Sequence, residues 1–320
     1  MFLARLPFQE DAAEAAIETL ESGAEEGFNA GEVIIEHIAN SGLDHPLIHL
    51  PHLGPIDMSV TKHVLMLWIV AVAVFFIVTL TVRKYLRQSD PVPTGFMGVI
   101  EAMVVFIRDQ IAAPNVGQKW VMTWTPWLLT FFVFILGANA IGMIPLFDVL
   151  GLLNHAVFHP EAESFLASVV HGGTTATANF NVTAGLATVT FFAIIFAGTL
   201  AHGFVQHWKN LVPSGLAKPI YILLIPIELM GMFVKPFALT MRLAANMTGG
   251  HIAILAILSF VFLFAEMFES TMAGIGVGIV ASLPLAIGIS ALEIIVILVQ
   301  AYVFTLLTAV FIGMAIHAHH

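Results

Sequence analysis

The chain has 320 residues, of which 59% are hydrophobic and 10% are charged, and its formal net charge is −10. Soluble domains carry about 25% charged residues, so this composition excludes a soluble enzyme and predicts an all-α membrane protein. The negative charge argues against a nucleic-acid partner, which requires clustered Lys and Arg. The absence of cysteine excludes disulfides, thiolate catalysis and cysteine-bound metal ions.

The N-terminal segment is acidic, because 11 of the 21 Asp and Glu residues lie between Glu10 and Asp57. It lacks the basic start and apolar middle of a secretory signal and the Arg-rich character of a transit peptide. We therefore expect residues 1–57 to form an extension outside the membrane and residues 58–320 to form the membrane domain. No HExxH-type metal pair is formed by its histidines, which are His37, His45, His49 and His52.

The first half of the membrane domain contains two spans. A bilayer core needs about 20 apolar residues per crossing, and residues 62–80 and 124–144 meet this requirement. The segment 96–113 between them carries three charged residues and is too polar to span. Its pattern predicts a helix that lies at the membrane surface.

The second half contains a third span at 182–204 and two longer apolar segments. Residues 221–264 are too many for one perpendicular crossing at 1.5 Å per residue. They form either a short helix followed by a span or one long helix that is strongly tilted or partly flat. A hinge-like stretch at 266–278 precedes the last apolar segment, 279–316. The segments 221–264 and 279–316 are the predicted channel helices, which brings the total to about five spans.

The basic residues predict the orientation in the membrane. The loop at 146–180 has no Lys or Arg, whereas the loops on the other side of the spans are basic. The positive-inside rule then places the N-terminus outside and, after five crossings, the C-terminus in the cytoplasm. The basic loop residues are Arg83, Lys84, Arg87, Arg108, Lys119, Lys209 and Lys218.

An arginine lies deep inside one of the channel segments. Arg242 is over 20 residues from either end of its apolar run, and a charge there costs a few kcal/mol by insertion scales. One explanation is a salt bridge to another helix. The other is a permanent positive charge in an ion path, which suits arginine because its pKa, above about 12, prevents it from releasing the proton.

Helical spacing groups other polar residues with this arginine. Glu228, Lys235 and Arg242 are seven residues apart and fall on one stripe, which Asn246 continues. His251 falls on the opposite face, where it can meet a neighbouring helix.

The last apolar segment supplies a partner for that histidine. Glu293 and Gln300 are seven residues apart and share a face. A carboxylate in hydrocarbon costs several kcal/mol unless it is paired or wetted. Because histidine and glutamate both exchange protons, His251 and Glu293 form a candidate proton relay. A static buried hydrogen bond is the alternative.

Two segments carry a family resemblance: KPFALTMRLAANMTGGH at 235–251 and LEIIVILVQAYVFTLL at 292–307. Together with NAIGMIP in the second span, they resemble subunit a of F-type ATP synthases. The resemblance runs from about residue 40 to the C-terminus. The acid and the histidine are placed as in mitochondrial and related bacterial members.

This resemblance implies a stator proton-channel subunit in a bacterial inner membrane, without cofactor and not an enzyme on its own. The implied partners are the c-ring, b-type peripheral stalk subunits, membrane lipid and the transported protons. Sodium stays open as the ion, because the ion-binding carboxylate belongs to the ring. By resemblance, Arg242 is the stator arginine that faces this carboxylate, and Glu228 lines the inner half-channel. The outer half-channel is lined by Asn246, His251, Glu293 and Gln300.

A secondary transporter or a subunit of a respiratory-type proton pump is the alternative. Such proteins usually show inverted repeats or matching broken helices, and the sequence shows neither. A structural scaffold would not need ionisable residues inside the bilayer. No GxxxxGK[ST] loop is present, so nucleotide chemistry is expected on partner subunits.

Overall fold

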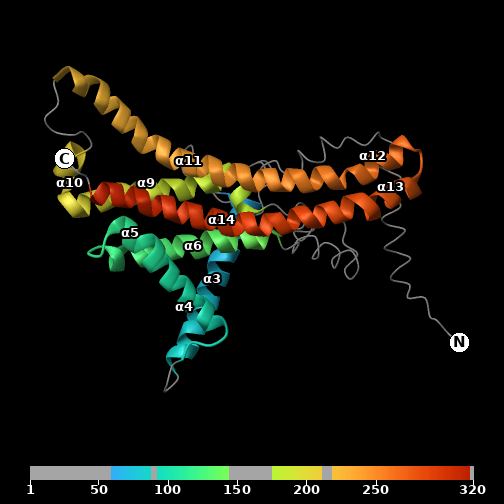
Figure 1. Cartoon of the computed structure of the whole chain (residues 1–320), viewed down its shortest axis with the longest axis horizontal. Coiled ribbons are helices and arrows are strands. Elements are labelled where there is room, and N and C mark those ends of the chain that lie inside the picture. The colour runs from blue at the N-terminus through green and yellow to red at the C-terminus, as the bar shows by residue number, and fades with distance from the viewer. Residues whose placement is uncertain (1–58, 88–91, 144–174, 211–217, 318–320) are drawn as a thin grey trace. The chain divides into compact units, whose positions relative to one another are not determined.

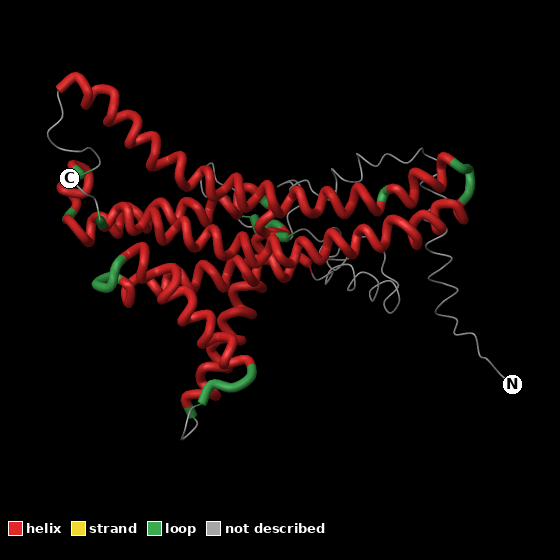
Figure 2. The backbone as a smooth tube through the Cα atoms, viewed as in Figure 1, coloured by secondary structure: helices red, strands yellow, loops and turns green. Residues whose placement is uncertain are grey.

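The computed structural model describes residues 59–87, 92–143, 175–210 and 218–317. In these ranges the regular elements are helices, drawn red in Figure 2, which confirms the all-α prediction. The extension predicted at 1–57 lies outside the described residues. Within the described ranges, five helical segments are long and apolar enough to cross a membrane, which confirms the expected number. They are His63–Leu86, Val121–Met143, Phe180–His202, Pro219–Met267 and Thr271–Ile316.

The described residues form two compact units. One unit consists of Thr248–Ile295. The other contains the described residues up to Met247 and from Val296 onward. Helices α11 (Lys218–Leu258) and α14 (Leu283–Ile316) each contribute residues to both units.

The first two spans match their predicted positions. Helix α3 (Lys62–Leu86) begins where predicted and continues six residues further, through a basic last turn that suits the negative end of the helix dipole. Helix α6 spans Val121–Met143. The two helices approach closely at Gly137, where an added Cβ would lie 3.1 Å from the Val74 side chain.

The predicted surface helix is present as three consecutive pieces: α4 (Phe96–Phe106), the π-helix η1 (Ile107–Ala112) and α5 (Ala113–Val116). One side of this segment packs into the core and the other is exposed, so it is amphipathic as expected. The residues on its packed side are Ile107, Ile111, Ala112 and Val116, all fully buried. Its location on the membrane surface stays a prediction.

The third span is α9 (Phe180–His202), which begins and ends two residues before the predicted bounds. The Asn179 side chain caps it by accepting a hydrogen bond from the Asn181 amide. The helix ends at Gly203, whose φ of 87° favours glycine. A short helix, α10 (Phe204–Lys209), follows.

The fourth segment is one long helix rather than a short helix followed by a span. Helix α11 has 41 residues and contains Pro226 and Pro236 without ending at either. Prolines inside helices are better tolerated in membrane proteins than in water. Only the short helix α12 (Phe260–Met267) follows it within the apolar run.

The hinge predicted at 266–278 is wrong for most of its length. Residues Thr271–Val277 form helix α13, which packs beside α12 after a tight turn (Figure 1). The Ser270 side chain caps α13. Gly274 permits this close packing, because a Cβ on it would lie 2.5 Å from the Val261 carbonyl oxygen. The π-helix η3 (Gly278–Ser282) then leads into α14.

The core of the larger unit is formed by α6, α9, η1 and the C-terminal part of α14, which lie side by side (Figure 1). The rings of Phe131 on α6 and Phe304 on α14 stack with centroids 5.8 Å apart. The hydroxyls of Thr190 on α9 and Thr308 on α14 are 3.4 Å apart. These contacts hold the C-terminal part of α14 in place and thereby position Gln300.

Candidate functional site

Arg242, the arginine that the sequence places deep inside an apolar segment, has no partner within the described part of the chain. Arg242 lies in α11, 23 residues after Pro219 and 25 before Met267, the ends of its candidate span. Its side chain is exposed on the isolated chain and makes no ion pair or hydrogen bond to any described residue. The salt bridge to another helix is therefore absent from the described ranges. Arg242 is thus an exposed cation without an ionic partner among the described residues.

The surface around Arg242 is mostly apolar, with one amide side chain. Phe237 and Met241 beside it are exposed, and Asn246, four residues on, is exposed too. The opposite side of α11 is buried in the core through Leu239, Leu243 and Met247, which recur at helical spacing. Two small residues, Ala245 and Gly249, are also exposed on this side of α11. This face can accept a closely packed helix.

His251 and Glu293 lie together, as the sequence predicted. His251 Nε2 is 3.9 Å from Glu293 Oε1, and the side chains are 17% and 5% exposed. This distance is longer than a direct hydrogen bond between these two atoms. Glu293 Oε1 has no hydrogen-bond partner among the described residues. A small approach of the two groups, or one bridging water, would permit proton transfer.

The position of the Glu293 carboxylate beside α11 depends on Gly250, the residue before His251. A Cβ added to Gly250 would lie 2.9 Å from Glu293 Oε1 and 3.2 Å from its carboxyl carbon. The absence of a side chain at Gly250 therefore creates the space that Glu293 occupies. Seven residues after Glu293 on α14, Gln300 is also buried, at 7% exposure.

A separate polar cavity of about 130 Å³ contains Glu228. Glu228 and Lys235 both line it from α11, whereas Arg242 does not. The Lys235 ammonium lies 5.7 Å from the centre of the Phe311 ring. His207 and Asn210, from the end of α10, complete the polar part of the wall.

The sequence analysis did not identify His207 as a site residue. The imidazole is 5% exposed, and its Nε2 has no hydrogen-bond partner among the described residues. Burial lowers the pKa of His207, and the positive charge of His202 lowers that pKa further. In the sequence, His207 is only a histidine just past the end of a span, and nothing in its spacing signals burial.

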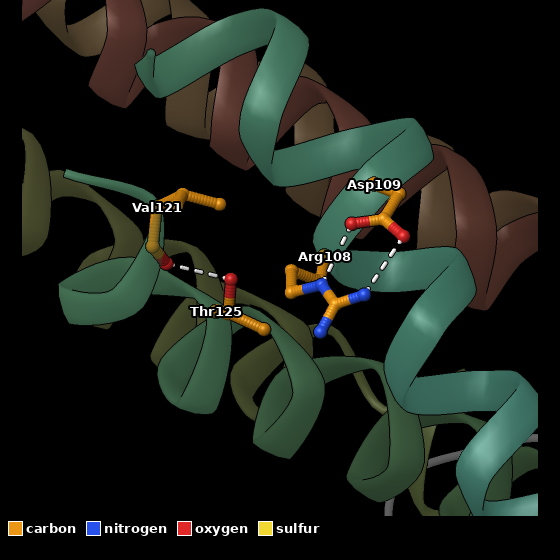
Figure 3. Close-up of polar contacts among 4 residues, drawn as sticks. All are labelled: Arg108, Asp109, Val121 and Thr125. Atoms are coloured by element: carbon orange, nitrogen blue, oxygen red, sulfur yellow. Dashed lines mark hydrogen bonds and ion pairs between the residues drawn. The ribbon is translucent and has the colours of Figure 1, made fainter. Parts of the chain in front are cut away.

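An exposed ion pair lies away from these groups, on the segment that follows α4. The Arg108 guanidinium donates from Nε to Asp109 Oδ1 at 2.7 Å and from Nη2 to Oδ2 at 2.9 Å (Figure 3). The pair raises the pKa of Arg108 and lowers that of Asp109. Such surface pairs contribute little stability. In the same view, the Thr125 hydroxyl donates to the Val121 carbonyl oxygen at 2.6 Å.

The described ranges contain no cluster of three His, Asp or Glu side chains that could hold a metal ion. The four N-terminal histidines considered above lie outside these ranges.

Comparison with known proteins identifies relatives over nearly the whole chain. The family model for the ATP synthase A chain matches residues 64–313, which include all the site residues described above. ATP synthase subunit a of Pelodictyon phaeoclathratiforme is 37% identical over 95% of this chain and 80% of its own length. ATP synthase subunit a 2 of Chlorobium luteolum is 38% identical over 92% of this chain and 78% of its own length.

Proposed function

Because the chain belongs to the ATP synthase A chain family, we propose that Arg242, the His251–Glu293 pair and Glu228 carry its proton path. The protein is a multi-pass membrane component of the ATP synthase and serves as its stator proton channel. The nucleotide chemistry belongs to other subunits of the complex, and this chain is not catalytic by itself. It lies in a bacterial inner membrane, with its N-terminus outside and its C-terminus in the cytoplasm.

The observation that carries this proposal is the Arg242 cation, which has no partner among the described residues and lies on an exposed, mostly apolar face. A carboxylate on a rotor helix is the natural counter-ion for Arg242, because a charge in hydrocarbon costs several kcal/mol unless it is paired. That carboxylate belongs to the c-ring. While it faces Arg242 it stays ionised, and the same positive charge repels a proton that would pass straight through. Small residues on this face leave room for the ring to pass.

Proton uptake takes place from the outer side. The pair His251 and Glu293, with Gln300 and Asn246, forms the outer half-channel and delivers a proton to the rotor carboxylate. Once neutral, this carboxyl group enters lipid at much lower cost than its charged form. The rotor can then turn away from Arg242.

Proton release takes place on the inner side. After nearly a full turn, the rotor carboxyl loses its proton to the inner half-channel, which contains Glu228. Each charge that crosses yields about 2.3 kcal/mol per 100 mV of membrane potential. The separation of the two half-channels by Arg242 converts this energy to torque. Subunits of b type attach the chain to the peripheral stalk.

Removal of the cation tests the proposal directly. In vesicles that contain the whole complex, Arg242→Ala should abolish ATP-driven proton pumping, because nothing then holds the rotor carboxylate ionised. Arg242→Lys should also fail, because a buried lysine can lose its proton. The matched control is Arg108→Ala, which removes an exposed arginine outside the candidate spans. Normal pumping by both Arg242 variants would refute the proposed role.

A further inference from the structure

The cavity that Glu228 lines has three further polar side chains in its wall. Its polar wall comes from two elements: His207 and Asn210 from the end of α10, and Glu228 and Lys235 from α11. The C-terminal part of α14 contributes the apolar wall, including Phe311. A volume of about 130 Å³ is sufficient for a few water molecules.

A glycine on the neighbouring helix α9 leaves the space that the imidazole of His207 occupies. A Cβ at Gly198 on α9 would lie 2.0 Å from His207 Nδ1, so only glycine permits this position of the ring. The turn at Gly203, with φ of 87°, directs α10 back against α9. The imidazole is thus enclosed by packing, although it lies beyond the last residue of its candidate span.

The enclosed ring has an unsatisfied polar atom. His207 Nε2 is buried and finds no hydrogen-bond partner in the described ranges, whereas most buried polar side-chain atoms have one. A nitrogen of this kind, on the wall of a polar cavity, requires water. Water would connect His207 to Glu228 without direct contact between their side chains.

The charged groups near His207 are of both signs. Glu228 and Lys235 face the cavity from α11, His202 lies close on α9, and Lys209 follows on α10. The lining residues of α14 carry no charge. The Glu228 carboxylate thus shares this cavity with the amine of Lys235 and the imidazole of His207.

We propose that His207 is the residue that passes protons from Glu228 to the inner aqueous phase. This inference rests on the proposed function, which places Glu228 in the inner half-channel. The protonated Glu228 gives its proton to cavity water, and that water gives a proton to a His207 ring nitrogen. The imidazolium then loses one proton to bulk water. One proton leaves, Glu228 returns to carboxylate and His207 returns to neutral imidazole.

The surroundings of His207 favour rapid release. Burial and the neighbouring His202 lower the pKa of His207, so the imidazolium is short-lived at neutral pH. Together these groups direct the proton outward from the cavity.

The test uses vesicles that contain the complete membrane sector of the synthase, with a potassium diffusion potential that drives protons toward the side of α10. The variant His207→Gln should lower the passive proton flux by about tenfold. This is less than the roughly hundredfold loss of a fixed proton-transfer group, because cavity water provides a partial bypass. The matched control is His317→Gln, which alters a histidine outside the cavity whose Nδ1 contacts the Gly313 carbonyl oxygen.

A membrane-impermeant buffer separates a relay role from a structural one. Added on the side of α10, a concentrated morpholine-sulfonate buffer should restore most of the flux of His207→Gln, whereas the same buffer on the other side should not. A wild-type flux in His207→Gln would overturn the inference, as would a loss of flux that buffer on neither side restores. If Arg242→Ala still abolishes pumping in the same vesicles, the proposed function survives that failure.

Discussion

The glycine before His251 provides a sharp test of the proton path. In Gly250→Ala the new methyl carbon would start 2.9 Å from Glu293 Oε1, whereas ordinary contacts begin at 3.4 Å. The carboxylate must therefore move by about 0.5 Å. A 1 Å misplacement of reacting groups can cost about a hundredfold in rate, so a shift of half that size should slow proton transfer by about tenfold.

The assay for this variant is passive proton flux through reconstituted complex. Gly185→Ala on α9 is the matched control, because it adds the same methyl to a helix position where nothing lies within 4 Å. Both changes increase helix propensity equally, by about 1 kcal/mol, so propensity cannot explain a difference between them. The reasoning would be refuted if Gly250→Ala and Gly185→Ala conducted protons at the same rate.

Three further changes test other parts of the structure. Glu293→Gln should leave the complex assembled, because the amide keeps the size of the buried group, but should strongly lower ATP-driven pumping in vesicles. Gly198→Ala should destabilise the chain by about 1–3 kcal/mol through overpacking against His207, whereas Gly185→Ala on the same helix meets nothing within 4 Å; thermal unfolding in detergent compares them. The lowered pKa of His207 means that the unfolded chain binds this proton more readily than the folded chain. Relative to His207→Gln, the wild type should therefore lose melting temperature as pH falls below about 6.5 and show a constant difference above it.

Much of the helical layout could be predicted from the sequence, because membrane spans are long and apolar. The bounds of α6 and α9 agree within three residues with the predicted spans 124–144 and 182–204. The proximity of His251 and Glu293 was also predictable, since each polar side chain in an apolar run requires a partner.

The errors have a common physical cause. The stretch 266–278 was predicted to be a hinge, but at Gly274 the missing side chain allows α13 to pack against α12. A single sequence does not distinguish glycine used for backbone freedom from glycine used for close approach. The same ambiguity concealed His207, whose burial depends on Gly198, a residue on another helix.

The exposure of Arg242 also affects the life of the chain before it joins the synthase. A copy inserted into the bilayer alone would present its guanidinium to lipid, at a cost of a few kcal/mol. In the proposed function, a rotor carboxylate that docks beside Arg242 removes this cost, so we expect the unassembled subunit to be less stable than the assembled one. Quality-control proteases should therefore clear unassembled copies, and replacement of the arginine by a neutral residue should lengthen their lifetime in cells that lack the ring.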